Sequence, residues 1–180
     1  KLQDRVDTKF MFLDVHLIKV LEAMRNDYRV LSVKGHRFNN YETLYFDTDN
    51  LKMFLDHHNG KANRFKFRSR KYVESNLHFF EVKHKNSKGR TVKNRIKRDE
   101  IVREIIGESK EFLQNTSGHD SSIYHPKLWV NYTRMTFVNK FSEERLTIDV
   151  NLHYKNDTHQ KNFDRLVIAE VKRGSSKHSS

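Results

Sequence analysis

The sequence predicts a β-dominated α+β fold: a closed antiparallel barrel with charged side chains inside and helices packed outside. Several segments alternate charged and apolar residues, which gives each strand one charged and one apolar face. Short turns such as Asn59-Gly60 and Lys88-Gly89 favour antiparallel neighbours. Helical segments with one apolar face are available to cover the apolar side of the sheet. A flat sheet with its charged face in water is the alternative.

The segment from 63 to 70 shows the alternation most clearly. Its cations share one face of a strand, with phenylalanines opposite: Arg64, Lys66, Arg68 and Arg70 against Phe65 and Phe67. Two following segments repeat the pattern, with Glu81, Lys83 and Lys85 in one and Lys93, Arg95 and Lys97 in the next. The predicted charged faces carry fewer acids than cations. The acids are Asp7, Asp47, Glu81, Glu143, Asp149 and Glu170. We therefore expect a polyanion to bind among these strands.

Hydrophobic periodicity predicts the other elements. Strands are expected at residues 5–12, 27–33, 42–48, 64–70, 79–85, 91–97, 128–140, 143–152 and 165–172. Helices are expected at 15–26, at a short segment that Asp49 or Asn50 caps, and at 99–115 with an interruption near Gly107. Residues 154–162 are expected to form a loop. Together these elements predict one domain over residues 1–174, followed by a disordered tail at 175–180.

Composition restricts the class of partner. Lys and Arg number 35 against 23 Asp and Glu, a formal net charge of +12, so we expect an anionic partner such as a nucleic acid, a phosphorylated metabolite or a membrane surface. The lack of cysteine excludes disulfides and thiolate metal sites and fits a reducing compartment, so we expect a cytoplasmic location. No apolar run approaches the roughly 20 residues of a membrane span, so no transmembrane segment is expected.

The charged faces suit a polyphosphate together with a metal ion. Arginine is typical where planar, bidentate contacts to phosphate oxygens are needed. A hard cation such as Mg²⁺ or Mn²⁺ requires oxygen ligands, and the candidates are Glu170, Glu81 and then Asp149. Glu81 could equally be an ion-pair partner of Lys83 or Arg68. The sequence has no glycine-rich phosphate loop, so a P-loop ATPase or kinase is not supported.

These residues resemble the VTC domain, the polyphosphate polymerase branch of the triphosphate tunnel metalloenzymes (CYTH-like superfamily). The matching pieces follow the family order: Arg5–Phe10, Tyr45–Thr48, Asn63–Arg70, Phe80–Lys85, Tyr132–Arg134, Arg145–Asp149 and Glu170–Lys172. The resemblance implies an eight-stranded antiparallel tunnel that binds a triphosphate or a growing polyphosphate chain. It also implies a metal-dependent enzyme.

The resemblance also implies roles for individual residues. Phosphate binding at the catalytic centre would fall to Lys9, Arg68, Arg70, Lys83 and Arg134, and metal binding to Glu170. The remaining substrate-binding candidates on the charged faces are Arg64, Lys66, Lys85, Lys93, Arg95, Tyr132, Arg145 and Lys172. Two departures from the family pattern are Asp7, where the first strand usually has glutamate, and the end of the chain, where a further helical segment with a lysine is expected. The chain is therefore expected to be truncated relative to the family.

Three functions remain open from the sequence. The first is transfer of the γ-phosphate of ATP onto a polyphosphate chain, and the second is hydrolysis of an inorganic, nucleotide or RNA 5′ triphosphate. The third is binding of polyphosphate without catalysis. Specific nucleic-acid binding is not expected, because base stacking needs aromatic rings on the cationic face and Phe65 and Phe67 point away from it. The sequence leaves a membrane-protein partner undetermined.

Overall fold

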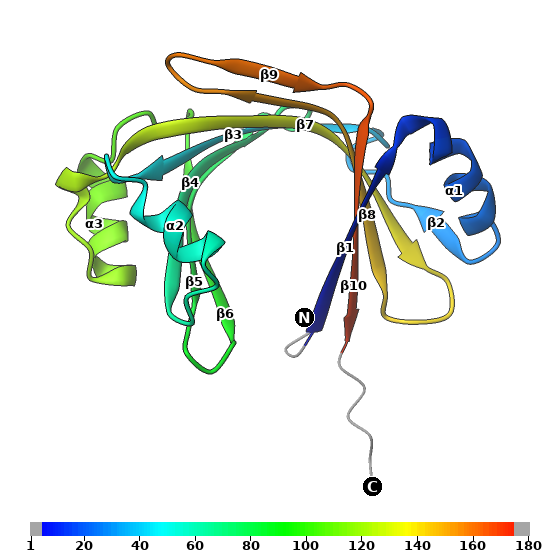
Figure 1. Cartoon of the computed structure of the whole chain (residues 1–180), viewed down its shortest axis with the longest axis horizontal. Helices are drawn as coiled ribbons and strands as arrows, with labels where there is room; N and C mark the ends of the chain where they lie inside the picture. Colours follow the sequence, from blue (N-terminus) through cyan, green and yellow to red (C-terminus); the bar gives the residue numbers. More distant parts are fainter. Residues whose placement is uncertain (1–4, 175–180) are drawn as a thin grey trace, which may run out of the picture. The chain divides into compact units, whose positions relative to one another are not determined.

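The structure, a computed structural model, describes residues 5–174 (Figure 1). The contacts among these residues divide them into two compact units. Unit 1 contains the described residues up to 40, residues 132–153 and those from 162 onward, and unit 2 contains residues 41–131 and 154–161. The long strand β7 (His125–Asn139) contributes to both units. The single domain expected over residues 1–174 stays a prediction, and the expected disordered tail at 175–180 lies outside the described residues.

Unit 1 is an antiparallel sheet with one covering helix. Its elements are β1 (Arg5–Leu13), the 3-10 helix η1 (Asp14–His16), α1 (Leu17–Met24), β2 (Tyr28–Val30), β8 (Arg145–Lys155), β9 (Gln160–Phe163) and β10 (Leu166–Gly174). The end of β8 and the start of β9 fall within residues 154–161 and belong to unit 2. The strand order is β1-β10-β8-β7, with β2 paired to β7 and β9 to β8. Leu17, Leu21 and Met24 recur at helical spacing and pack α1 against a core that contains Ile148 and Val167.

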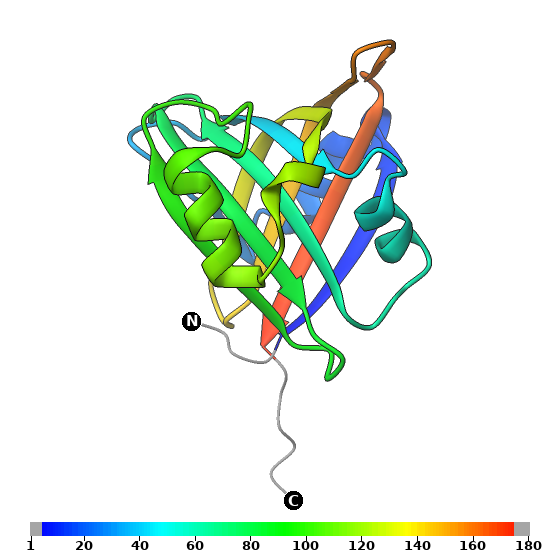
Figure 2. The same cartoon turned by 90° about the vertical axis from the view of Figure 1, so that its left-hand side faces the viewer.

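Unit 2 has the same construction on different strands. Its elements are β3 (Asn39–Asp47), α2 (Lys52–His58), β4 (Arg64–Tyr72), β5 (Leu77–Lys85), β6 (Thr91–Arg98), α3 (Gly107–Ser117) and the 3-10 helix η2 (Ser121–Ile123). The order is β7-β3-β4-β5-β6, and Figure 2 shows α3 lying across the sheet formed by β4, β5 and β6. Phe67, Phe80 and Leu113 are completely buried between this helix and the sheet.

The predicted β-dominated antiparallel fold is confirmed. Eight strands follow the order β1-β10-β8-β7-β3-β4-β5-β6, and every register determined between them is antiparallel. The predicted alternation is also confirmed in β4, where Phe67 is buried in the core and Arg68 points to the other face.

The helix predicted at residues 99–115 is shorter than expected. Residues 99–106 are not helical, and α3 begins only at Gly107, whose φ of +53° suits glycine. The Val102 amide donates to the Ser69 hydroxyl at 2.9 Å, and Ile105 is buried, so tertiary contacts hold this segment against the sheet in an irregular conformation. The other segments differ mainly in length, except that the expected loop at 154–162 includes the end of β8 and the start of β9.

The predicted cap of α2 is wrong. Neither Asp49 nor Asn50 caps this helix, because the Asp47 carboxylate accepts hydrogen bonds from the Met53 and Phe54 amides, both at 2.8 Å. These are among the helix N-terminal amides that have no partner within the helix. Asp47 therefore fixes α2 at the end of β3 instead of standing on the charged face as an available acid.

Candidate functional site

The charged face of unit 2 is built from β3, β4, β5 and β6. Antiparallel register places Lys66, Lys83 and Lys93 side by side in one row across β4, β5 and β6. The adjacent row contains Tyr45, Arg68, Glu81 and Arg95. The face therefore presents cations from three neighbouring strands around a single carboxylate, an arrangement that attracts an anion.

Glu81 is the electrostatic centre of this face. Its side chain is only 1% exposed, its Oε2 lies 2.6 Å from Arg68 Nε, and its Oε1 lies 2.5 Å from Lys93 Nζ. Burial by itself raises the pKa of Glu81, but the charges of Arg68, Lys93 and Arg70 outweigh burial and hold this pKa below its usual value. Glu81 is therefore an ionised partner that stabilises the packed cations, one of the two roles left open by the sequence.

Arg68 and Arg70 are held by neutral groups as well. Arg68 Nη1 donates to the Tyr45 hydroxyl at 3.2 Å, and Arg70 Nε donates to the Thr43 hydroxyl at 3.1 Å. Burial raises the pKa of Tyr45, but the neighbouring arginines lower it more, so the net shift is downward. These contacts restrict the guanidinium orientations, and preorganised donors of this kind suit recognition of phosphate oxygens.

Unit 1 has a second charged cluster on β1, β7, β8 and β10. Lys9 is the backbone partner of Glu170, and Lys172 Nζ lies 2.6 Å from Glu170 Oε2. Arg134 contacts Asp149 through two hydrogen bonds of 2.5 and 2.6 Å. Burial raises the pKa of Glu170, but Lys172, Lys9 and Arg134 together lower it below its usual value.

The remaining predicted residues contribute less to these two clusters. Tyr132 is buried, with its ring centroid 5.0 Å from Arg134 Cζ, so it supports that arginine. Arg64 Nε donates to His57 Nδ1 at 3.1 Å, so it is directed toward the end of α2. Arg145 is exposed, next to Lys172 in the β8–β10 ladder, and Lys85 is the backbone partner of Arg64.

A divalent cation fits Glu170 better than the other two predicted ligands. Both carboxylate oxygens of Glu81 and both of Asp149 already contact cationic side chains. Glu170 is the backbone partner of Thr147, whose buried Oγ1 forms no hydrogen bond within the described structure. One carboxylate with a nearby hydroxyl suits Mg²⁺ or Mn²⁺ that takes its other ligands from water and phosphate. Within residues 5–174, no three His, Asp or Glu side chains come together as a potential metal site.

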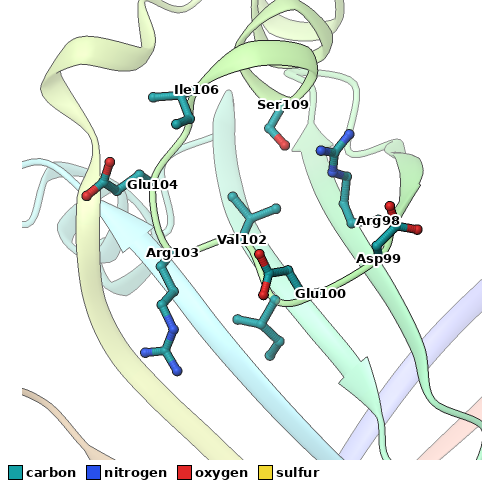
Figure 3. Close-up of a pocket in the computed structure, with 9 residues that line it drawn as sticks. Arg98, Asp99, Glu100, Val102, Arg103, Glu104, Ile106 and Ser109 are labelled. Atoms are coloured by element: carbon teal, nitrogen blue, oxygen red, sulfur yellow. The ribbon is translucent and has the colours of Figure 1, made fainter.

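The structure also contains a pocket of ≈ 400 Å³ beside the start of α3 (Figure 3). Its charged lining residues are of both signs: Arg98, Asp99, Glu100, Arg103 and Glu104. None of the predicted site residues lines this pocket. The mixed charge does not favour a polyanion, so the candidate site remains the charged faces of the sheet.

Some residues on the charged faces were missed as site candidates. Thr43 and Thr147 are buried hydroxyls adjacent in register to Arg70 and Glu170, respectively. Tyr72 and Phe79 lie on the same face as Arg70 and Glu81. The alternation of side chains along each strand indicates that these residues lie on the charged faces. Their importance depends on the register between strands, which the sequence pattern does not supply.

The chain belongs to the VTC domain family, whose family model matches residues 4–179. The resemblance inferred from the sequence is thereby confirmed. No curated protein matches the chain.

Solved structures share the fold at low sequence identity. A protein of Vibrio parahaemolyticus assigned as an adenylate cyclase is 12% identical with a TM-score of 0.56, and the match covers 99% of this chain and 80% of that one. A protein of Bacillus halodurans with the same assignment is 12% identical with a TM-score of 0.57, covering 98% and 83%. HpAC1 from Hippeastrum, an assigned adenylyl cyclase described as having a dominant triphosphatase activity, is 12% identical with a TM-score of 0.53, covering 93% and 79%.

Among the described residues, none of the helices has the length and apolar character that crossing a membrane requires. The cytoplasmic location stays a prediction.

Proposed function

We propose that this chain is a metal-dependent phosphotransferase that moves the γ-phosphate of ATP onto a polyphosphate chain. The observation that carries the proposal is the cluster of Arg68, Lys93 and Arg70 around the buried carboxylate of Glu81. Membership of the VTC domain family supports it. The proposal assigns phosphate binding to the cations of this cluster and to those of the unit 1 cluster, Lys9, Arg134 and Lys172.

The chemistry requires no nucleophilic side chain. The terminal oxygen of the polyphosphate acceptor attacks the γ-phosphorus of ATP, the bond to the β-phosphate oxygen breaks, and ADP leaves. Charge develops on oxygens of the transferred group, and fixed cations that already point toward them stabilise the transition state. Arg68 and Arg70 are held by Glu81 and Thr43 before any ligand arrives, so little reorganisation is required of them.

Glu170 would hold the divalent cation, with the Thr147 hydroxyl beside it. Such an ion supplies charge neutralisation on phosphate oxygens when it is bound. Lys172, 2.6 Å from the Glu170 carboxylate, keeps that group ionised and supplies a cation of its own to an incoming phosphate.

Hydrolysis of a triphosphate is the second candidate function. The fold likeness to HpAC1, described as having a dominant triphosphatase activity, favours it. The same cations would bind the substrate, and water would replace the polyphosphate end as nucleophile. Binding without catalysis is the third candidate, because a cationic face can retain polyphosphate with no reaction.

One experiment separates the three candidates. The protein is incubated with ATP and either Mn²⁺ or Mg²⁺, and both polyphosphate chain length and released phosphate are measured. Chains of increasing length would support the polymerase, phosphate release without chains would support the hydrolase, and ligand binding without turnover would support the binding module. Glu170→Gln should retain triphosphate binding and lose metal-dependent turnover. Wild-type turnover in this variant would reject Glu170 as the metal ligand.

A further inference from the structure

One end of the unit 2 charged face carries aromatic rings in place of lysines. Along β5, the residues on this face run from Lys85 and Lys83 through Glu81 to Phe79. On β4 and β3 the same end of the face holds Tyr72 and, opposite it in register, Tyr41. On β4 and β5 the face therefore changes from lysines at one end to rings at the other, whereas β6 keeps a cation, Lys97, opposite Phe79.

The rings form one connected cluster with two arginines. The centroids of Tyr41 and Tyr72 are 5.0 Å apart and those of Tyr72 and Phe79 are 5.9 Å apart, both in edge-to-face geometry. Arg95 Cζ lies 4.2 Å from the centroid of Phe79, and Arg70 Cζ lies 5.2 Å from that of Tyr41. We call Tyr41, Tyr72, Phe79 and Arg95 the aromatic end of the face.

The aromatic end remains accessible from the charged face. Its three rings are half-buried and Arg95 is exposed, whereas Phe65 and Phe67 face the apolar core on the other side of the sheet. The sequence-based exclusion of Phe65 and Phe67 from stacking is correct, but β3, β4 and β5 supply other rings on the cationic side. Flat rings beside an exposed guanidinium are the elements that proteins use to stack nucleic-acid bases.

The spacing along the strands suits a ligand with a charged tail and a flat head. Phe79 is two residues from Glu81 and four from Lys83 on the same strand face, which corresponds to roughly 7 and 13 Å at the rise of a β-strand. An extended nucleoside triphosphate separates its base from its terminal phosphate over a comparable distance. Phosphates between the lysine row and the row of Arg68 and Glu81 would therefore leave the base beside Phe79.

We propose that the aromatic end is a base-stacking subsite, through which the protein prefers a nucleoside triphosphate to inorganic triphosphate. This inference rests on the proposed function, because it requires the neighbouring cations to bind phosphates. Stacking uses the ring face of any base, so purine nucleotides bind with similar affinity. In the simpler alternative, the rings only hold Arg70 and Arg95 in position, and their loss would weaken every phosphate ligand equally.

The test compares Phe79→Leu with the wild type by isothermal titration calorimetry, using ATP, GTP and inorganic triphosphate as ligands. Leucine retains an apolar side chain at this half-buried position and removes the ring. We expect about tenfold weaker binding of ATP and GTP, in line with the measured cost of losing one stacked base, and less than about twofold change for inorganic triphosphate. Tyr72→Leu should show the same selective loss and serves if Phe79→Leu does not fold.

The matched control is Phe141→Leu, which removes a ring that is 79% exposed on the β7–β8 loop of unit 1. It should leave the affinities for all three ligands unchanged. Equal losses for ATP and inorganic triphosphate in Phe79→Leu would overturn the stacking subsite and leave the proposed function intact, as would unchanged affinity for every ligand. Failure of the wild type to bind inorganic triphosphate or ATP would overturn the proposed function and the subsite together.

Discussion

Replacing Arg68 by alanine should destabilise the fold as well as abolish phosphate binding, because Arg68 is a partner of a buried carboxylate. Glu81 is 1% exposed, and in Arg68→Ala it keeps Lys93 as an ion-pair partner, whose side chain is 38% exposed. Breaking a buried ion pair costs about 3–5 kcal/mol. Since Lys93 still compensates part of the charge, we expect the free energy of unfolding to fall by about 3 kcal/mol, the lower end of that range.

A second variant separates the charge of Glu81 from the lost packing. In Arg68→Ala with Glu81→Gln, the buried group is neutral, so the free energy of unfolding should recover by about 1–2 kcal/mol, a coupling typical of contacting residues. The control Arg98→Ala removes the partner of Glu108, which is 65% exposed, and should change stability by less than about 1 kcal/mol. Arg98 lies on β6, as Lys93 does, but its ion-pair partner is Glu108 on α3 and not Glu81.

Urea denaturation followed by circular dichroism measures these differences as shifts in midpoint at constant slope. The cost of Arg68→Ala should also depend on pH. The folded-state pKa of Glu81 is lowered in the wild type, so its contribution to stability is present above the unfolded pKa and is lost as pH falls through the folded pKa. The difference from wild type should therefore be full at neutral pH and shrink in acid. The reasoning would be refuted by a double variant no more stable than Arg68→Ala, or by a cost that is independent of pH.

Three further predictions concern Asp47, Lys93 and Arg134. Asp47→Ala leaves two amides of α2 without their acceptor and should lower the free energy of unfolding by about 1–2 kcal/mol, as in other helix caps; an unchanged urea midpoint would contradict this role. Burial, together with Arg68 and Arg70, lowers the pKa of Lys93 below its usual value, so triphosphate affinity should fall with rising pH before an ordinary lysine loses its proton. In Lys93→Arg that loss should move to higher pH, and identical pH profiles would exclude Lys93 as its cause. Arg134→Lys cannot reproduce the paired contacts to Asp149 and should weaken triphosphate binding about tenfold in calorimetry, whereas retained affinity would show that charge alone suffices.

Much of the fold was predictable because its cause is local. In β4 and β5 the period of two separates residues that pack in the core, such as Phe67 and Phe80, from charged residues such as Arg68 and Glu81. The predictions of secondary structure were wrong where contacts with residues distant in the chain change the local conformation. Residues 99–106 have helical periodicity, but the Ser69 hydroxyl and the core hold them in an irregular conformation.

The sequence by itself determined which residues share a strand face, and therefore that cations from several strands would form charged surfaces. Tertiary structure alone decided which groups the acidic side chains contact: Glu81 pairs with Arg68 and Lys93, while Asp47 binds helix amides. It also aligned Phe79 with Arg70 across β5 and β4. The physical reason is that side-chain alternation follows from the geometry of one strand, whereas register and ion pairing depend on segments far apart in the chain packing together.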